Sequence, residues 1–213
     1  VSDADFGLPP KKKSFEREKL MIRWLEEIRK DAHALYLVGD IFDYWFEYKK
    51  VVPRGFTRFL GKLAELSDEG LDIYFFTGNH DVWVFDYLPD EIGLKVIRKP
   101  VSHTFNGKKF YIAHGDGLGS GEWTFRVLKK MFTSKILQWI FARIHPNTSV
   151  GFAHRWSKHS RFSKGEYVPF MGEDKEHLII HSKNVLESDH YDFFVYGHRH
   201  IPLDMEIGKG RRI

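Results

Sequence analysis

The stretch Leu71–Asp81, LDIYFFTGNHD, decides how the rest of the chain is interpreted. Residues 73–77 are apolar, aromatic or β-branched, and turn-forming residues follow them, which is typical of a buried strand. Gly78 then opens a turn that carries Asn79, His80 and Asp81. A strand that ends in polar, metal-capable side chains is how an α/β sheet presents chemistry at its carboxyl edge.

The same arrangement recurs at four other places, each with Asp or His near the predicted end of a strand. These are Ser2–Asp5, Leu35–Asp40, Lys109–His114 and Asp192–His200. One such strand end could arise by chance, but five predict a single polynuclear metal site assembled from distant parts of the chain. The candidate ligands are Asp3, Asp5, Asp40, Asn79, His114, His198 and His200.

Size and composition limit the class of protein. The chain has 213 residues, enough for one domain (1–213) with room for an insertion. It contains no cysteine, so any metal must be held by nitrogen and oxygen ligands. No stretch reaches the roughly 20 apolar residues of a membrane span, and the first residues do not resemble a signal peptide. Val1 falls near the end of an expected strand, so we expect residues to precede it.

Alternating strand and helix patterns predict a two-sheet α/β sandwich, with a parallel half followed by a mostly antiparallel half. Ser14 is the expected cap of the first helix, and Asn106-Gly107 predicts a hairpin. Pro89 is expected to stop a short helix. The predicted helices cover 15–30, 53–69, about 84–87 and 174–188, and the predicted strands cover 35–39, 73–77, 94–97, 103–105, 109–113, 193–196 and 202–207.

Residues 123–165 do not follow this alternation of strands and helices. They are predicted to form an inserted helical lid over the strand ends that carry the metal site. The segment is rich in large apolar residues and holds nine Lys or Arg without any Asp or Glu. The rest of the chain carries 24 basic and 29 acidic residues. Such asymmetry indicates an anionic partner such as a phosphate, a nucleic acid or a membrane surface. The alternative is an ordinary helical hairpin that completes the core, which would not explain the charge bias.

The candidate ligands mix nitrogen and oxygen donors, which suits Mn²⁺, Fe, Zn²⁺ or Ni²⁺ better than Ca²⁺ or Mg²⁺ alone. Two such ions can share a carboxylate, clamp a phosphate and deprotonate a water molecule. Asp40 is the expected bridge between them. His80 is the expected catalytic donor to the phosphoryl oxygens, and Asp81 is expected to hold its tautomer. The remaining histidines are expected to be structural.

The order of these motifs resembles the calcineurin-like metallophosphoesterase superfamily. The pattern Asp-x-His, Gly-Asp, Gly-Asn-His-Asp, His and Gly-His-x-His is found at 3, 40, 78–81, 114 and 198–200. The resemblance implies two divalent ions, with manganese expected. It also implies that one ion is held by Asp3, position 5, Asp40 and His200, and the other by Asp40, Asn79, His114 and His198.

Within that superfamily, residues 39–45, residues 114–118 and the basic insertion are similar to the UDP-2,3-diacylglucosamine hydrolase family of lipid A biosynthesis. This resemblance implies cleavage of the diphosphate by metal-bound hydroxide, giving lipid X and UMP. It also implies a lipid-linked sugar nucleotide substrate, no nucleic acid partner, and a monomer on the cytoplasmic face of the inner membrane. The implied substrate contacts are Glu122, Phe125, Arg126 and Lys129.

Two positions depart from the pattern. Position 5, where the superfamily has His, is Asp5, which is shorter and adds negative charge, so the first metal would bind differently. Position 80 is His as in the superfamily at large, whereas the best-known forms of the hydrolase have Arg, which leaves the subgroup open.

Two rival functions remain. A nuclease or nucleotide phosphodiesterase would need an extended basic groove, whereas here the positive charge is confined to one apolar segment. A degenerate scaffold without metal is supported only by Asp5.

Overall fold

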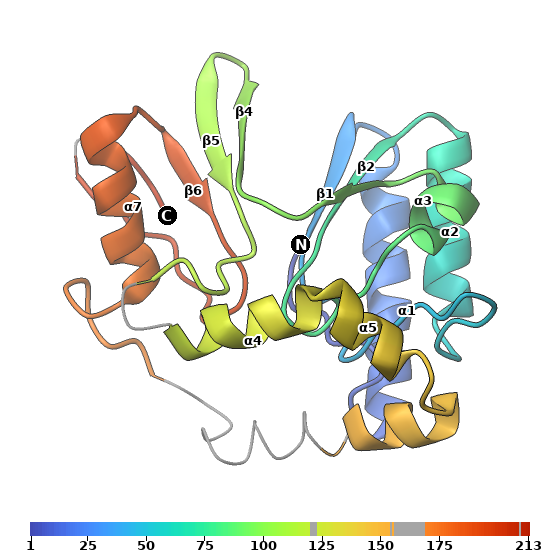
Figure 1. Ribbon diagram of the computed structural model, residues 1–213. Helices are drawn as coiled ribbons and strands as arrows, with labels where there is room; N and C mark the ends of the chain where they lie inside the picture. Colours follow the sequence, from blue (N-terminus) through green and yellow to red (C-terminus); the bar gives the residue numbers. More distant parts are fainter. Residues whose placement is uncertain (120–122, 154, 156–168, 209) are drawn as a thin grey trace.

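Two three-stranded sheets form the centre of the computed structural model (Figure 1). The structure describes residues 1–119, 123–153, 155, 169–208 and 210–213. In the first sheet, β1 (Ala34–Val38), β2 (Asp72–Phe76) and β3 (Lys95–Ile97) are parallel. In the second, β5 (Lys108–Ile112) pairs antiparallel with β4 (Val101–Phe105) and parallel with β6 (Phe193–Val195). The predicted two-sheet α/β fold is therefore confirmed.

Apolar side chains pack between the sheets and on their outer faces. Val38 and Phe76 of the first sheet meet Ile112 of the second. The helices α1 (Lys11–Ile28), α2 (Thr57–Asp68) and α3 (Tyr87–Ile92) lie beside the first sheet (Figure 1). The core on this side includes Phe42, Trp45 and other fully buried aromatic residues. On the other side, α7 (His177–Ser188) packs Ile179 against Phe194 of the second sheet.

Several predicted details of the elements are wrong, for local reasons. The first helix begins at Lys11 rather than 15, and Ser14 lies inside it, where its hydroxyl accepts a hydrogen bond from the Gly7 amide at 2.7 Å. Pro89 does not stop a helix but lies in the first turn of α3, where its missing N–H has no intrahelical partner to lose.

The second half of the chain is mixed rather than mostly antiparallel, because β6 pairs parallel with β5. Residues 202–207 form no strand. They pair with residues 211–213 through an isolated bridge between Glu206 and Arg212 and through backbone hydrogen bonds between Met205 and Ile213.

The predicted insertion lies between β5 and β6 and contains α4 (Trp123–Thr133), α5 (Lys135–Phe141) and a helical stretch at 146–153. In Figure 1, α4 and α5 run across one end of the two sheets. The predicted lid residues 154 and 156–165 lie outside the described part of the chain. Among the described residues, every helix is too short or too polar to cross a membrane.

Candidate metal centre

The candidate ligands reach one place on short loops that follow the strands. Asp40 follows β1, Asn79 follows β2, His114 follows β5, and His198 follows β6. The first residues of the chain lie alongside the end of β1, where the Asp3 and Asp5 amides donate to the carbonyl oxygens of Gly39 and Asp40, each at 3.0 Å. The carboxyl edges of both sheets therefore contribute to one site, as the sequence predicts.

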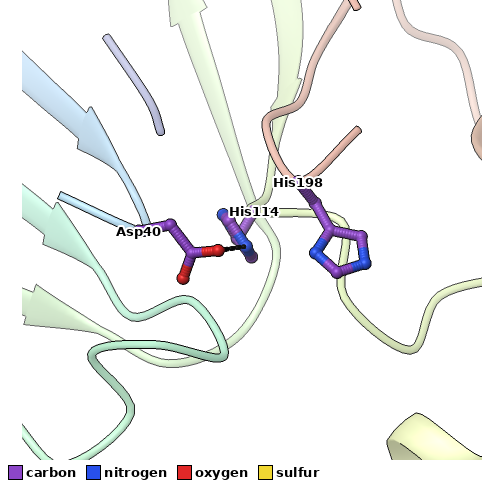
Figure 2. Close-up of side chains that lie close together, drawn as sticks. All are labelled: Asp40, His114 and His198. Atoms are coloured by element: carbon purple, nitrogen blue, oxygen red, sulfur yellow. Dashed lines mark ion pairs between the residues drawn. The ribbon is translucent and has the colours of Figure 1, made fainter. Parts of the chain in front are cut away.

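One group of ligands consists of Asp40, His114 and His198, whose ligand atoms all lie within 4.8 Å of one another (Figure 2). Nε2 of His114 lies 3.2 Å from Oδ2 of Asp40. Nδ1 of the same ring lies 2.9 Å from the Val38 carbonyl oxygen. Because a carbonyl only accepts, Nδ1 carries the proton in the neutral ring, which leaves the Nε2 lone pair directed at the group.

A second group surrounds His200. Its Nε2 lies 3.4 Å from Oδ1 of Asp3, and its Nδ1 lies 3.9 Å from Oδ2 of Asp5. The Asp3 carboxylate also accepts the backbone amide hydrogen of His198, at 3.0 and 3.1 Å to its two oxygens. This contact joins the second group to the first, although Asp3 and His198 are 195 positions apart in the sequence.

Asn79 presents a buried side-chain oxygen that has no hydrogen-bond partner among the described residues. A buried polar atom without a partner is costly, so such an atom indicates a missing ligand. A divalent cation accepts electron pairs from amide oxygens, and it would satisfy this atom.

Glycines provide the space that the ligands occupy. A Cβ atom on Gly39 would overlap the His114 ring, one on Gly78 would overlap the Asp40 carboxylate, and one on Gly197 would overlap Asp3. The glycines that precede Asp40, Asn79 and His198 therefore have a steric reason to be there.

The backbone at the site is held in an unusual conformation. Five candidate ligands have positive φ angles although they are not glycine: Asp3 (52°), Asp5 (48°), Asp40 (51°), His198 (70°) and His200 (51°). Only two other non-glycine residues in the described part of the chain share this feature, Phe56 and Asn106. Such conformations are sparsely populated and cluster at functional sites, where the surroundings impose them.

Electrostatic coupling within the first group is strong. Burial alone would raise the pKa of Asp40, but the facing His114 and nearby His80 lower it well below its usual value. Burial would lower the pKa of His114, but the Asp40 carboxylate raises it. Burial, followed by the charge of Asp40, raises the pKa of Asp81. Without a cation, the site therefore favours an ion pair between Asp40 and the His114 imidazolium.

The roles predicted for His80 and Asp81 need one correction. The Asp81 carboxylate accepts the backbone amide hydrogens of Gly78 at 2.7 Å and Ile41 at 2.8 Å, so it ties the two loops together. Nδ1 of His80 lies 3.0 Å from the carbonyl oxygen of Asp43. Asp43 therefore takes the orienting role that proximity in sequence had suggested for Asp81.

The start of α4 lies against the site. The Phe125 ring meets the His198 ring edge-on, with centroids 5.2 Å apart. Arg126 lies beside Gly117. Lys129, predicted to bind substrate, forms an ion pair at 2.8 Å with the buried Asp116. Glu122 lies outside the described residues.

Sequence reasoning missed Asp43, Asp116, Glu176 and Arg199. Asp43, Asp116 and Arg199 lie inside the motifs quoted above and could have been singled out there. Glu176, the residue before α7, pairs with Arg199 and has no signal in the sequence.

The residues present fit the binding of divalent metal. Carboxylates, imidazoles and an amide oxygen converge, one imidazole presents its lone pair, and Asn79 has an unsatisfied oxygen. Such a mixed nitrogen and oxygen set suits a first-row transition metal.

Comparison with known proteins identifies the family. Residues 15–202 match the Calcineurin-like phosphoesterase family. A UDP-2,3-diacylglucosamine hydrolase of Porphyromonas gingivalis is 40% identical over 227 aligned positions, covering 100% of this chain and 86% of the relative. Enzymes of the same name from Histophilus somni and Edwardsiella ictaluri are 23% and 26% identical, each over 85% of this chain and over 76% and 68% of the relatives. The chain therefore belongs to the calcineurin-like phosphoesterase family.

Proposed function

We propose that this protein hydrolyses UDP-2,3-diacylglucosamine to 2,3-diacylglucosamine 1-phosphate (lipid X) and UMP. The observation that carries the proposal is the 40% identity over the whole chain to a protein named for this reaction. The convergence of Asp40, His114 and His198 in one buried group supports it.

In this proposal the two groups of ligands hold two divalent ions, with Mn²⁺ as the favoured ion. Asp40 is the proposed bridge between the ions, while Asn79, His114 and His198 would complete one site and Asp3, Asp5 and His200 would complete the other. The ions, when bound, would activate the attacking water and neutralise charge on the phosphate.

His80 is the proposed donor to the phosphoryl group. Its side chain is 21% exposed, and its Nδ1 lies 3.0 Å from the Asp43 carbonyl oxygen. Donation to that carbonyl leaves Nε2 to face the substrate, where the protonated ring would stabilise developing negative charge. Asp81 contributes by fixing the loops that carry Asp40 and His80.

The insertion is proposed to bind the rest of the substrate. Phe125 and Arg126 lie at the edge of the metal centre and would contact the sugar and the diphosphate. Farther along, α4 and α5 expose many large apolar side chains: Trp123, Val127, Met131, Ile136, Leu137, Trp139 and Ile140. Each methylene of an acyl chain buried there contributes about 0.8 kcal/mol.

The same exposed face, rich in Lys and Arg, is proposed to rest on an anionic membrane surface. Peripheral attachment to the cytoplasmic face of the inner membrane would bring the enzyme to a substrate whose acyl chains lie in the bilayer.

The direct test is to incubate the purified protein with UDP-2,3-diacylglucosamine in detergent, with and without Mn²⁺, and to measure UMP. We expect metal-dependent UMP release, and loss of most of that activity in His114→Ala with the fold retained. A generic aryl phosphodiester and single-stranded DNA serve as competing substrates. Faster turnover of DNA would support a nuclease, and absence of both metal binding and turnover would support a binding scaffold.

A further inference from the structure

The turn that carries His198 and His200 is tied to α7 by a buried ion pair. Arg199, the residue between the two histidines, contacts both oxygens of Glu176 through Nε and Nη2, the second at 3.1 Å. The side chain of Glu176 is only 4% exposed, and that of Arg199 is 15% exposed. A guanidinium that meets a carboxylate at two points fixes orientation as well as distance.

This turn needs such support because both histidines are strained. His198 and His200 have φ angles of 70° and 51°, a region that residues with a Cβ rarely adopt. Conformations of this kind persist only where the surroundings impose them. The Arg199 backbone is itself in a tight turn, in which its amide donates to the Gly197 carbonyl oxygen at 2.8 Å.

The beginning of α7 contacts the other histidine loop as well. A Cβ atom on Gly115 would touch Leu178 of α7 and the Cβ of His198, and one on Gly119 would overlap His177. The Gly197 amide donates to the His114 carbonyl oxygen at 3.0 Å, which joins the two loops. One end of one helix therefore supports three of the candidate ligands.

We propose that Glu176 is a positioning residue that, through Arg199, holds His198 and His200 in the geometry required to bind divalent metal. Glu176 contacts the orienting arginine rather than the reacting atoms. The inference rests on the proposed metal site but not on the identity of the substrate.

The test measures metal affinity directly, by titrating Mn²⁺ into the metal-free protein in a calorimeter. Glu176→Gln keeps the size of the side chain and removes its charge, while Arg199→Lys keeps the charge and removes the two-point contact. We expect each variant to bind Mn²⁺ about 10- to 100-fold more weakly, as is typical when residues that orient metal ligands are changed.

Glu173→Gln is the matched control. Glu173 lies three positions earlier and pairs with Lys183 at 2.8 Å, away from the histidine turn. We expect this variant to bind Mn²⁺ as tightly as the wild type. The double variant Glu176→Gln/Arg199→Lys should bind Mn²⁺ about as tightly as the single variant with the lower affinity, because both changes remove the same contact.

Circular dichroism and thermal melting of the metal-free proteins verify folding, and Arg199→Lys keeps the test valid if Glu176→Gln fails to fold. Wild-type affinity in folded Glu176→Gln or Arg199→Lys would overturn the proposal, as would an equal loss in Glu173→Gln. If the wild type itself binds no Mn²⁺, the proposed function fails instead, which distinguishes the two failures.

Discussion

At the scale of single residues, the metal centre depends on glycines, whose lack of a side chain leaves room for the ligands. Gly39, Gly78 and Gly197 each leave room for a ligand from another strand end. A methyl group in any of these places would have to displace a carboxylate or an imidazole from the centre.

Gly78→Ala should therefore weaken metal binding. The added Cβ would overlap the Asp40 carboxylate, and overpacking of this kind costs about 1–3 kcal/mol of stability. The measurement is chemical denaturation together with Mn²⁺ titration. The control is Gly61→Ala in α2, where a Cβ meets no atom within 4 Å and should stabilise the helix by about 0.5–1 kcal/mol. Unchanged Mn²⁺ affinity in Gly78→Ala would contradict the steric argument.

The ion pair of Glu176 should also appear in the pH dependence of stability. Burial opposes ionisation, but Arg199 lowers the pKa of Glu176 below its usual 4.5. The folded state then binds this proton less readily than the unfolded state, so the contribution is present at neutral pH and is lost as the pH falls through the lowered pKa.

Melting of the metal-free wild type and Glu176→Gln from pH 7 to about pH 3 checks this prediction. The wild type should be more stable at neutral pH, and its advantage should shrink in acid. A difference that stays constant with pH would show that the carboxylate charge does not contribute.

Most ligand residues could be found from sequence because a local pattern carries the information: Asp40, Asn79, His198 and His200 follow a strand and a glycine, and His114 follows a strand and precedes Gly115. Their supports could not be found in this way. Asp81 seemed the natural partner of His80 because the two are neighbours in sequence, yet its carboxylate binds the amides of Gly78 and Ile41. Arg199 and Glu176 meet only through the tertiary fold.

At the scale of elements, the insertion is attached to the core by an aromatic anchor. The Trp83 indole nitrogen donates to the Phe132 carbonyl oxygen at the end of α4, at 2.8 Å. Its ring stacks on Phe141 of α5 with centroids 5.3 Å apart, and Phe46 packs against the same Phe141. Trp83, which follows β2, and Phe46, which follows β1, thus hold α4 and α5 beside the carboxyl ends of the strands.

Trp83→Leu should loosen this attachment and raise the KM for the diacylated substrate severalfold, since Trp83 contacts both helices. Turnover of a small aryl phosphodiester, which does not need the insertion, should change much less. Trp83→Phe, which keeps a ring but loses the N–H, should have a KM for the diacylated substrate between those of the wild type and Trp83→Leu. An equal loss with both substrates would indicate damage to the metal centre rather than to the insertion.

Helices and strands with strong patterns were predictable to within a few residues, including the hairpin at Asn106-Gly107, because burial on one face selects their period. The predictions were wrong where tertiary contacts determine where a helix begins or how two strands pair. Ser14 is held by the Gly7 amide instead of capping a helix, and the parallel pairing of β6 with β5 depends on a connection of about 80 residues that no local pattern encodes.

At the scale of the whole molecule, charge and exposed apolar surface are concentrated together. The described insertion residues 123–153 include no acidic residue, and several of their large apolar side chains are more than half exposed, including Trp123, Ile136 and Trp139. A segment that combines basic residues with exposed apolar side chains is typical of a surface that rests on anionic lipid.

Sedimentation with lipid vesicles tests this arrangement. We expect the protein to bind vesicles containing anionic lipid more than neutral ones, and less at about 0.5 M salt, where charges are screened. Ile136→Ser, at a side chain that is 72% exposed, should weaken binding by roughly tenfold. Leu20→Ser on α1, also exposed at 59%, should have no effect. Equal effects of the two changes would place the membrane contact elsewhere.

The hydrogen bond from the His198 amide to the Asp3 carboxylate links residues 195 positions apart. During translation, Asp3 leaves the ribosome long before His198 is made. A nascent chain therefore contains the acidic ligands Asp3 and Asp5 well before it contains His198 and His200. A chain that lacks the segment with His198 and His200 would lack ligands of both groups, so we expect it to bind a transition metal more weakly than the chain that contains them.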